Sequence, residues 1–313
     1  MRTRRLGSDG PEVSVVGVGC NNFGFRLDYD GTKAVVDAAL DAGVTLFDTA
    51  DAYSAGTSEE FLGRALGSRR DEVLIATKWG GTPFNGELPP APDVPKGSRE
   101  FVRWACEHSL QRLGTDRIDV YQYHFPDNTT PLEETLGALR ELVDEGKVRF
   151  IGSSNQPPSG VEEADRVARE RGWPRFVSAQ NRYSLVTRDA EEELLPLCER
   201  LGVGFLPYFP LESGLLTGKV KRGQAPPEGT RLAGGAMERF GTAEAFDRVE
   251  ALEAFAVERG VTLLDVAIGG LLAMPAVTCV IAGAMTPEQV RSNVAAGAWE
   301  PSADDAAALR ALR

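Results

Sequence analysis

The chain predicts an α/β fold, a (β/α)8 TIM barrel in a single domain over residues 1–313, and three regularities support this prediction. Short apolar runs recur eight times, and most are apolar throughout, as parallel strands covered on both faces should be. Amphipathic segments of helical spacing separate the runs. Most of these segments end on a glycine suited to a left-handed helix cap. The runs span residues 15–19, 44–48, 73–77, 118–123, 148–152, 176–180, 203–208 and 277–282.

The first part of the chain carries the signals for a hairpin and two helices. Residues 5–11 read RLGSDGP, which is the turn chemistry of an N-terminal β-hairpin ahead of the first barrel strand. A segment with helical apolar spacing follows over residues 32–42. Asp48 ends the second apolar run. Thr57 and Glu60 then have the spacing of a capping box, so we expect the next helix to start there.

Two later helices carry start signals of their own. Thr130-Pro131-Leu132-Glu133 and Thr286-Pro287-Glu288-Gln289 each combine an N-cap threonine, a proline in the first turn and a Glu or Gln side chain. A barrel needs about 250 residues, so the surplus lies in loops at 80–97 and 212–241 and in a tail after Pro301. Because both loops follow strands, we expect them over the C-terminal face, where barrels place their chemistry.

A doubly wound sheet is the alternative fold. Gly17-Val18-Gly19 could begin a dinucleotide-binding fingerprint, with Asp48 ending the second strand. However, Asn22 stands where the third glycine belongs, and Asp48 lies beyond the usual separation of about 20 residues. The barrel is therefore the preferred interpretation.

Composition and charge exclude several classes of protein. The formal net charge of −12 argues against binding to nucleic acid or to an anionic membrane surface. Apolar residues make up 42% and charged residues 26%, as in soluble globular proteins. The four cysteines are far apart and fit no zinc spacing, which predicts free thiols in a reducing, cytoplasmic compartment. We identify no signal peptide and no segment apolar enough to span a bilayer.

Four polar residues fall at or near the expected strand ends. Asp48, Lys78 and His124 follow the second, third and fourth runs, and Tyr53 lies on the loop after Asp48. Each alone has an ordinary explanation as a turn cap, a solvated lysine, a packed tyrosine or a structural histidine. In a barrel, however, all four converge on one mouth, so we interpret them as one site.

Together these side chains suit a general acid. The unperturbed pKa of tyrosine is about 10, and a Lys78 cation beside Tyr53 should lower that pKa. Asp48 would hold the ammonium, and His124 would hydrogen-bond the substrate oxygen, so a carbonyl oxygen could be protonated there. The hydride must come from a cofactor, because no side chain supplies one. A metal-dependent hydrolase is the weaker alternative, since the chain has only two histidines.

Five motifs, in this order, resemble those of the aldo-keto reductase family over residues 13–296. They are Phe47-Asp48-Thr49-Ala50-x-x-Tyr53, Thr77-Lys78-Trp79, Ser109-Leu110-x-Arg112-Leu113-x-x-Asp116-x-Ile118-Asp119, Gly146-Lys147-Val148-Arg149-x-Ile151-Gly152-x-Ser154-Asn155 and Gly214-Leu215-Leu216-Thr217-Gly218-Lys219. The resemblance implies a (β/α)8 barrel, a nicotinamide cofactor and reversible carbonyl reduction. It also implies that the family's catalytic tetrad falls on Asp48, Tyr53, Lys78 and His124.

The resemblance further implies a site for NADPH, with NADH as the alternative. Ser154, Asn155 and Gln180 match the residues that hold the nicotinamide carboxamide, and Tyr208 matches the ring that stacks on nicotinamide. The remaining matches are Gly19, Cys20 and Asn21 after the first strand, Leu211 and Ser213 at the pyrophosphate, and Gly283, Met285, Gln289 and Asn293 at the adenosine phosphate. The chemistry agrees, because amides suit a carboxamide and loops after the last two strands are the usual phosphate site of a barrel.

Two departures from the family pattern concern charge. Glu212 stands close to the expected pyrophosphate, which its carboxylate would repel unless the side chain turns outward or pairs. Residues 283–286 lack the basic residue that many relatives use against the 2′-phosphate, and Arg291 is the nearest candidate. We therefore expect NADPH to be preferred by a modest margin.

The expected function is that of a cytoplasmic oxidoreductase that reduces small-molecule aldehydes or ketones, with no nucleic-acid or membrane partner. Phe23, Trp79 and Phe125 flank strand ends and would form an aromatic wall for the substrate. The alternative is that these rings simply pack the barrel rim. The alternative function is that of a cofactor-binding regulatory protein of this fold, like the channel-associated β subunits that resemble it. The sequence does not determine the oligomeric state.

Overall fold

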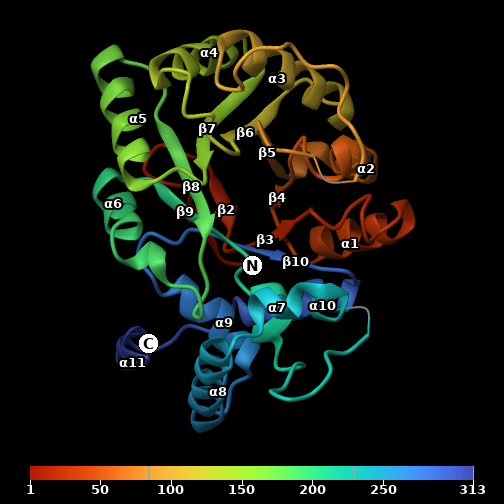
Figure 1. Cartoon of the computed structure of the whole chain (residues 1–313), viewed down its shortest axis with the longest axis vertical. Coiled ribbons are helices and arrows are strands. Elements are labelled where there is room, and N and C mark those ends of the chain that lie inside the picture. The colour runs from red at the N-terminus through yellow and green to blue at the C-terminus, as the bar shows by residue number, and fades with distance from the viewer. Residues whose placement is uncertain (84, 229, 313) are drawn as a thin grey trace.

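Eight parallel strands close into a barrel in the computed structural model, which describes residues 1–83, 85–228 and 230–312 (Figure 1). The barrel order follows the chain, and β10 pairs with β3 while Phe205 on β9 bridges to Val277, just before β10. The (β/α)8 prediction is confirmed. The strands are β3 (Val16–Gly19), β4 (Leu46–Asp48), β5 (Leu74–Trp79), β6 (Ile118–Tyr123), β7 (Val148–Ser154), β8 (Phe176–Arg182), β9 (Gly204–Tyr208) and β10 (Val280–Gly283).

The expected N-terminal hairpin is present. Strands β1 (Thr3–Arg5) and β2 (Glu12–Ser14) pair antiparallel ahead of β3. The turn places Leu6 in full burial, in one apolar cluster with barrel residues such as Leu46. The hairpin therefore packs against the apolar interior at one end of the barrel, so an active site would have to lie at the opposite end.

Helices surround the strands (Figure 1). They are α1 (Tyr29–Asp41), α2 (Thr57–Leu66), α3 (Arg99–Leu113), α4 (Leu132–Asp144), α5 (Pro158–Arg171), α6 (Leu194–Leu201), α7 (Met237–Phe240), α8 (Ala243–Glu258), α9 (Leu263–Leu272), α10 (Pro287–Ala296) and α11 (Ala303–Ala311). Helix α3 shows how the sequence sets both ends of a helix. The Ser98 hydroxyl accepts from the amide of Phe101 at 3.3 Å, and Gly114 ends the helix with a left-handed φ of 61°.

Helix α2 starts at Thr57 as expected, but two of the expected threonine caps are not formed. Gly56 is the N-cap residue of α2, and Thr57 makes no cap because its own φ of −59° and ψ of −30° are helical, whereas a threonine cap needs an extended backbone. Helix α4 has Pro131 at its N-cap, while the Thr130 hydroxyl donates to Asp127 at 2.8 Å instead. The start of α10 is confirmed, since Thr286 accepts from the amide of Gln289 at 3.3 Å.

The barrel interior is layered. Its lower part is an apolar cluster of Leu6, Val13, Leu46, Ala76, Val120, Val177, Leu206, Cys279 and Ile281. Polar side chains that are also buried, among them Asp48, Lys78, Gln122 and Gln180, come from the strand residues nearer the C-terminal ends. Burying a charged ammonium is costly unless its partners satisfy it, so this layer marks where the fold places its chemistry.

Candidate active site

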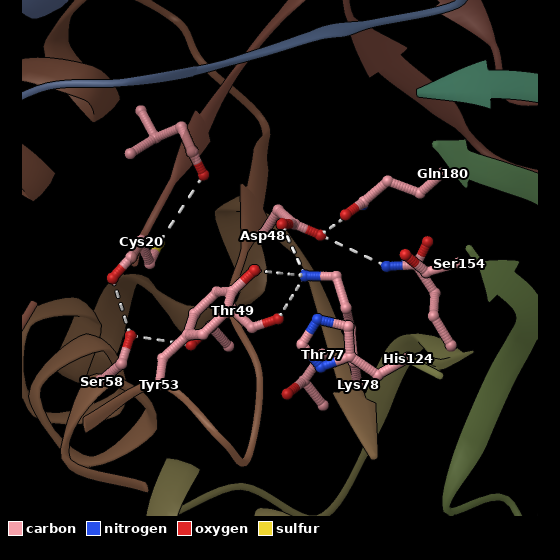
Figure 2. Close-up of polar contacts among 12 residues, drawn as sticks. Cys20, Asp48, Thr49, Tyr53, Ser58, Thr77, Lys78, His124, Ser154 and Gln180 are labelled. Carbon is pink, nitrogen blue, oxygen red and sulfur yellow. Dashed lines mark hydrogen bonds and ion pairs between the residues drawn. The ribbon is translucent and has the colours of Figure 1, made fainter. Parts of the chain in front are cut away.

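The ammonium of Lys78 is the centre of the buried polar layer (Figure 2). Its Nζ donates to Asp48 Oδ2 at 2.7 Å, to the carbonyl oxygen of Thr49 at 2.8 Å and to the Tyr53 hydroxyl at 3.3 Å. The Lys78 side chain is fully buried and that of Asp48 is 5% exposed, so the pair is shielded from solvent. Three acceptors thus satisfy the three N–H bonds of the ammonium.

The charges of the pair set the protonation states around it. Burial by itself lowers the pKa of Lys78, but the carboxylate of Asp48 and the phenol of Tyr53 outweigh it and raise the pKa above 10.5. For Tyr53 the balance is reversed. Burial raises the pKa of the phenol above 10, and Lys78 only partly opposes this. Lys78 lowers the pKa of Tyr53 as expected, but the net pKa is raised, because the desolvation of the phenolate exceeds the attraction of the cation.

Two glutamines hold the other oxygen of Asp48. Gln180 Nε2 donates to Oδ1 at 2.8 Å, and Gln122 Nε2 lies 3.3 Å from the same atom. Gln122 was not among the site residues predicted from the sequence. Its signal was available, because Gln122 lies two residues before His124, in the Tyr-Gln-Tyr segment that ends the fourth apolar run. The carboxylate is thereby fixed from both sides and aimed at Lys78.

His124 lies beside the phenol. Its ring meets Tyr53 edge-on with centroids 5.8 Å apart and stacks on Phe125 at 4.7 Å. Burial lowers the pKa of the imidazole well below 6.5, and the cations Lys78 and Lys96 add to that lowering. The ring is therefore neutral near pH 7 and can donate one hydrogen bond without carrying charge.

A second buried network supports the loop that carries Tyr53. Glu59 is fully buried, accepting from Arg112 Nε at 2.7 Å and from the Thr77 hydroxyl at 2.5 Å. Asp51 is also buried, and its amide donates to the carbonyl oxygen of Lys78 at 3.0 Å. Burial and the nearby charge of Glu59 raise the pKa of Asp51 to about 7, against the opposing effect of Arg112. None of these residues was predicted from the sequence to belong to the site.

The backbone of this loop is unusual directly after Tyr53. Ser54, Ala55 and Gly56 have φ values of 50°, 50° and 92°. Such conformations cost free energy in non-glycine residues and persist only where surrounding contacts enforce them. Here Arg112 packs against Gly56 so closely that a Cβ there would lie 2.4 Å from its Cδ. The left-handed turn sends the chain into α2 and leaves Tyr53 beside Lys78.

The four residues of the predicted tetrad are thus brought together, and a cavity of about 1070 Å³ opens above them. Asp48, Tyr53 and His124 line it, and Lys78 reaches it through Tyr53. Its walls include twelve of the thirteen expected cofactor residues, namely Gly19, Asn21, Ser154, Asn155, Gln180, Tyr208, Leu211, Ser213, Gly283, Met285, Gln289 and Asn293. Cys20 is the exception. It is fully buried, and its thiol contacts the carbonyl oxygen of Val18 at 3.6 Å, because its side chain turns away from the cavity.

The amide residues of the cavity already bond to one another. Tyr208 donates its hydroxyl to Asn155 Oδ1 at 2.8 Å, and Asn155 Nδ2 donates to the His124 carbonyl at 2.9 Å and to Ser154 Oγ at 3.0 Å. Asn155 has a left-handed φ of 54°. The chain thus presents a preformed amide and hydroxyl wall next to the imidazole.

The charges of the cavity contrast with those of the whole chain. Although the net charge is −12, the cations Arg26, Lys219, Arg231 and Arg239 line the cavity. Arg231, which was not predicted from the sequence, donates from Nη2 to Asn21 Oδ1 at 2.6 Å and to Asn22 Oδ1 at 2.7 Å. More than two hundred residues separate these partners in the chain. No local pattern could have paired them.

Two expectations about charge are resolved by pairing. Glu212 is buried and accepts from Arg182 Nη2 at 2.7 Å and Ser184 Oγ at 2.6 Å, so its charge is compensated. Arg291 instead pairs with Glu288 at 3.0 Å on the exposed face of α10, and it does not line the cavity. The anticipated role of Arg291 thus has no support in this geometry, because its side chain leaves the helix on the solvent side.

The aromatic wall is largely absent. Phe23 and Trp79 are fully buried and do not line the cavity. Trp79 stacks on Tyr123 with centroids 4.9 Å apart and donates from Nε1 to the carbonyl oxygen of Lys96 at 3.1 Å. Of these three rings, only Phe125 lines the cavity, and it is 49% exposed. Two of the three rings therefore pack the rim, as the alternative interpretation held.

The described residues contain neither a metal-ligand cluster nor a helix that could span a membrane. No group of three or more His, Cys, Asp or Glu side chains in residues 1–83, 85–228 and 230–312 is arranged to hold a metal ion. Over the same ranges, no helix combines the length and the apolar character needed to cross a membrane. All four cysteines are buried and free.

The barrel and its buried Lys–Asp–Tyr cluster define a class of protein, and comparison with known proteins agrees. The sequence profile of the Aldo/keto reductase family matches residues 15–313, and the chain belongs to that family. It is 35% identical over 308 residues to a probable voltage-gated potassium channel subunit beta of Oryza sativa subsp. japonica. It is 34% identical over 307 residues to a protein of the same description from Arabidopsis thaliana. Both alignments cover 95% of this chain and 91% of the relative.

A third relative carries a different description. The chain is 40% identical over 221 residues to a probable aldo-keto reductase 1 of Glycine max. That alignment covers 69% of this chain and 61% of the soybean protein. Similarity therefore extends both to a protein described as a reductase and to proteins described as channel subunits.

Proposed function

We propose that this protein is an NAD(P)H-dependent oxidoreductase that reduces aldehydes or ketones to alcohols, reversibly, in the cytoplasm. The observation that carries the proposal is the buried ammonium of Lys78, bonded at once to Asp48 and to the Tyr53 hydroxyl at the edge of a large cavity. Members of the family are typically NAD(P)H-dependent oxidoreductases. The proposed general acid is Tyr53, which burial keeps protonated up to high pH.

The residues that line the cavity fit a nicotinamide dinucleotide. Its volume of about 1070 Å³ is at the upper end of the range of about 300–1,000 Å³ for ligand pockets. Ser154, Asn155 and Gln180 offer the amide and hydroxyl groups that a carboxamide needs, and Tyr208 offers an aromatic face. For the phosphates we propose Lys219 and Arg231, two cations in the wall of a cavity within an acidic protein.

The chain's own residues account for the proton. When bound, a reduced nicotinamide is the group that supplies hydride to a carbonyl carbon. Tyr53 then gives its hydroxyl proton to the carbonyl oxygen as that oxygen becomes an alkoxide. Lys78, held by Asp48, stabilises the phenolate left on Tyr53, and the neutral His124 donates a hydrogen bond to the same oxygen. Burial makes these electrostatic interactions stronger than they would be in water.

The experiment is a pair of measurements on the purified protein. Fluorescence titration with NADPH and NADH gives the two dissociation constants, and steady-state oxidation of the tighter-binding cofactor is then followed with a panel of aldehydes and ketones. Turnover that depends on carbonyl concentration supports the proposal. Absence of turnover with every carbonyl, despite cofactor binding, would refute it.

A regulatory protein with slow turnover is the second candidate. The observation in its favour is the similarity, over 95% of the chain, to proteins described as probable channel β subunits. Such a protein would bind the cofactor tightly and oxidise it slowly. A measurement with NADPH and carbonyl in excess over the protein separates the two, because an enzyme continues to oxidise NADPH in a fast steady state, whereas a regulator that holds its cofactor oxidises one equivalent and then continues only slowly.

A further inference from the structure

The imidazole of His124 is positioned by close packing on its buried side. Nothing among the described residues hydrogen-bonds its Nδ1, which is buried. The ring is confined by Phe125, by the edge of Tyr53 and by the backbone of Gly81. A Cβ at Gly81 would lie 2.7 Å from Nδ1 and 2.8 Å from the Cβ of Ala52. The position of the Gly81 backbone therefore restricts the rotation of the His124 imidazole ring.

The side chain of Lys96 holds the carbonyl groups of that stretch of backbone. Lys96 Nζ donates to the carbonyl oxygens of both Gly80 and Gly81, each at 3.0 Å. Gly80 has a φ of 88°, and because a glycine adopts positive and negative φ about equally, the contact with Lys96 helps to fix its conformation. The ammonium of Lys96 thus connects the two ends of the loop at 80–97, directly beside the imidazole.

The backbone of Lys96 is anchored independently of its ammonium. Trp79 Nε1 donates to the Lys96 carbonyl oxygen at 3.1 Å. The next residue, Gly97, donates its amide to Asp127 Oδ2 at 2.6 Å and accepts from the Thr135 hydroxyl at 2.8 Å. Removing the ammonium should therefore release Gly80 and Gly81 while leaving the return limb of the loop in place.

We propose that Lys96 is a positioning residue that holds His124 in its working orientation through the carbonyl groups of Gly80 and Gly81. The inference rests on the proposed function, since it concerns a group assigned to the substrate oxygen. Lys96 lies 28 residues before His124 and was not predicted from the sequence to take part in the site. Its role depends on a contact between loops that only the barrel brings together.

Lys96 also acts on the charge state of His124. Burial, Lys78 and Lys96 together lower the pKa of the imidazole. The other titratable groups nearby are Tyr53, the Asp48 partner of Lys78, and Asp51, whose carboxyl group hydrogen-bonds the Gly80 amide. Removing the Lys96 cation should raise the His124 pKa, and loosening the packing that buries the imidazole should raise it further.

The test is an NMR titration of the histidine rings, because the chain has only His108 and His124. His108 serves as the internal reference, since its Nδ1 contacts the Trp104 carbonyl oxygen at 2.8 Å within α3. In Lys96→Met, the titration midpoint of His124 should rise while that of His108 stays constant. Lys33→Met is the control for charge loss, because Lys33, with its side chain 42% exposed, pairs with Asp37 on α1.

Activity provides the second readout. In Lys96→Met, kcat for aldehyde reduction should fall about 10- to 100-fold, the range expected for a misplaced catalytic group. The dissociation constant of NADPH should change less than about twofold, since Lys96 does not line the cavity. Lys96→Arg, which can bridge the same two carbonyl oxygens, should restore both the kcat and the His124 midpoint. Gly81→Ala, which presses on Nδ1 directly, should reproduce the loss with Lys96 in place.

The outcomes separate this inference from the proposed function. A His124 titration that is the same in Lys96→Met and wild type overturns the inference, whatever the activity. A shifted titration with unchanged kcat also overturns it, because the orientation would then not matter. A shifted His124 in a protein that reduces no carbonyl supports the contact and removes the proposed reaction.

Discussion

The buried carboxyl group of Asp51 should make the protein less stable at neutral pH than at acidic pH. Its side chain is 2% exposed, and its Oδ1 has no hydrogen-bond partner among the described residues. Burial, with the charge of Glu59, raises its pKa from 3.8 to about 7. The folded state therefore keeps this proton at pH values where the unfolded chain has already lost it. Stability should fall as the pH rises from about 4 to about 7 and then level off.

The magnitude follows from the shift. A difference of about 3 pKa units, at about 1.36 kcal/mol each, gives about 4 kcal/mol as the upper end of the penalty at pH 8. Asp51→Asn keeps the shape of the protonated acid and carries no charge. We therefore expect the variant to be more stable than wild type by about 1–4 kcal/mol at pH 8 and nearly equal to it at pH 4.

The assay is urea unfolding followed by circular dichroism at several pH values between 4 and 8. Asp37→Asn is the matched control, because Asp37 lies on α1 with its side chain 45% exposed, paired with Lys33. Its effect should stay within about 0.5 kcal/mol at every pH. A variant Asp51→Asn that is no more stable than wild type at pH 8, or equally stabilised at all pH values, would show that the carboxyl group is not held protonated by burial.

Three further predictions concern the site. Tyr53→Phe should lower turnover by at least about 10²-fold and leave cofactor affinity unchanged, as steady-state rates and titration would show; near-normal turnover would exclude Tyr53 as the acid. Lys78→Met should cost nearly as much, and adding Asp48→Asn should cost little more, since the two act as one buried pair; fully additive losses in kcat would contradict this. Arg231→Ala should weaken NADPH binding, because Arg231 lines the cavity. Arg291→Ala should leave the ratio of the NADPH and NADH dissociation constants unchanged, because Arg291 pairs with Glu288 outside the cavity. A changed ratio in Arg291→Ala would restore Arg291 as the residue that recognises the 2′-phosphate.

Much of the barrel and the tetrad could be predicted from sequence because their signals are local. Apolar runs mark buried strands, and the residue after a run lies at the C-terminal end of its strand. Asp48, Lys78 and His124 were found in this way, and the structure brings them together with Tyr53. The hairpin and the helix start at Thr286 were local signals of the same kind.

What the tertiary structure decided depends on burial and on partners distant in the chain. The direction of the Tyr53 pKa shift is a balance of desolvation against one cation, which spacing cannot reveal. Glu212 is neutralised by Arg182, thirty residues earlier, and Arg231 reaches Asn21 across the mouth of the barrel. A motif names the side chains that can do chemistry. Only the folded chain determines which of them face the cavity, which are paired, and how much water they lose.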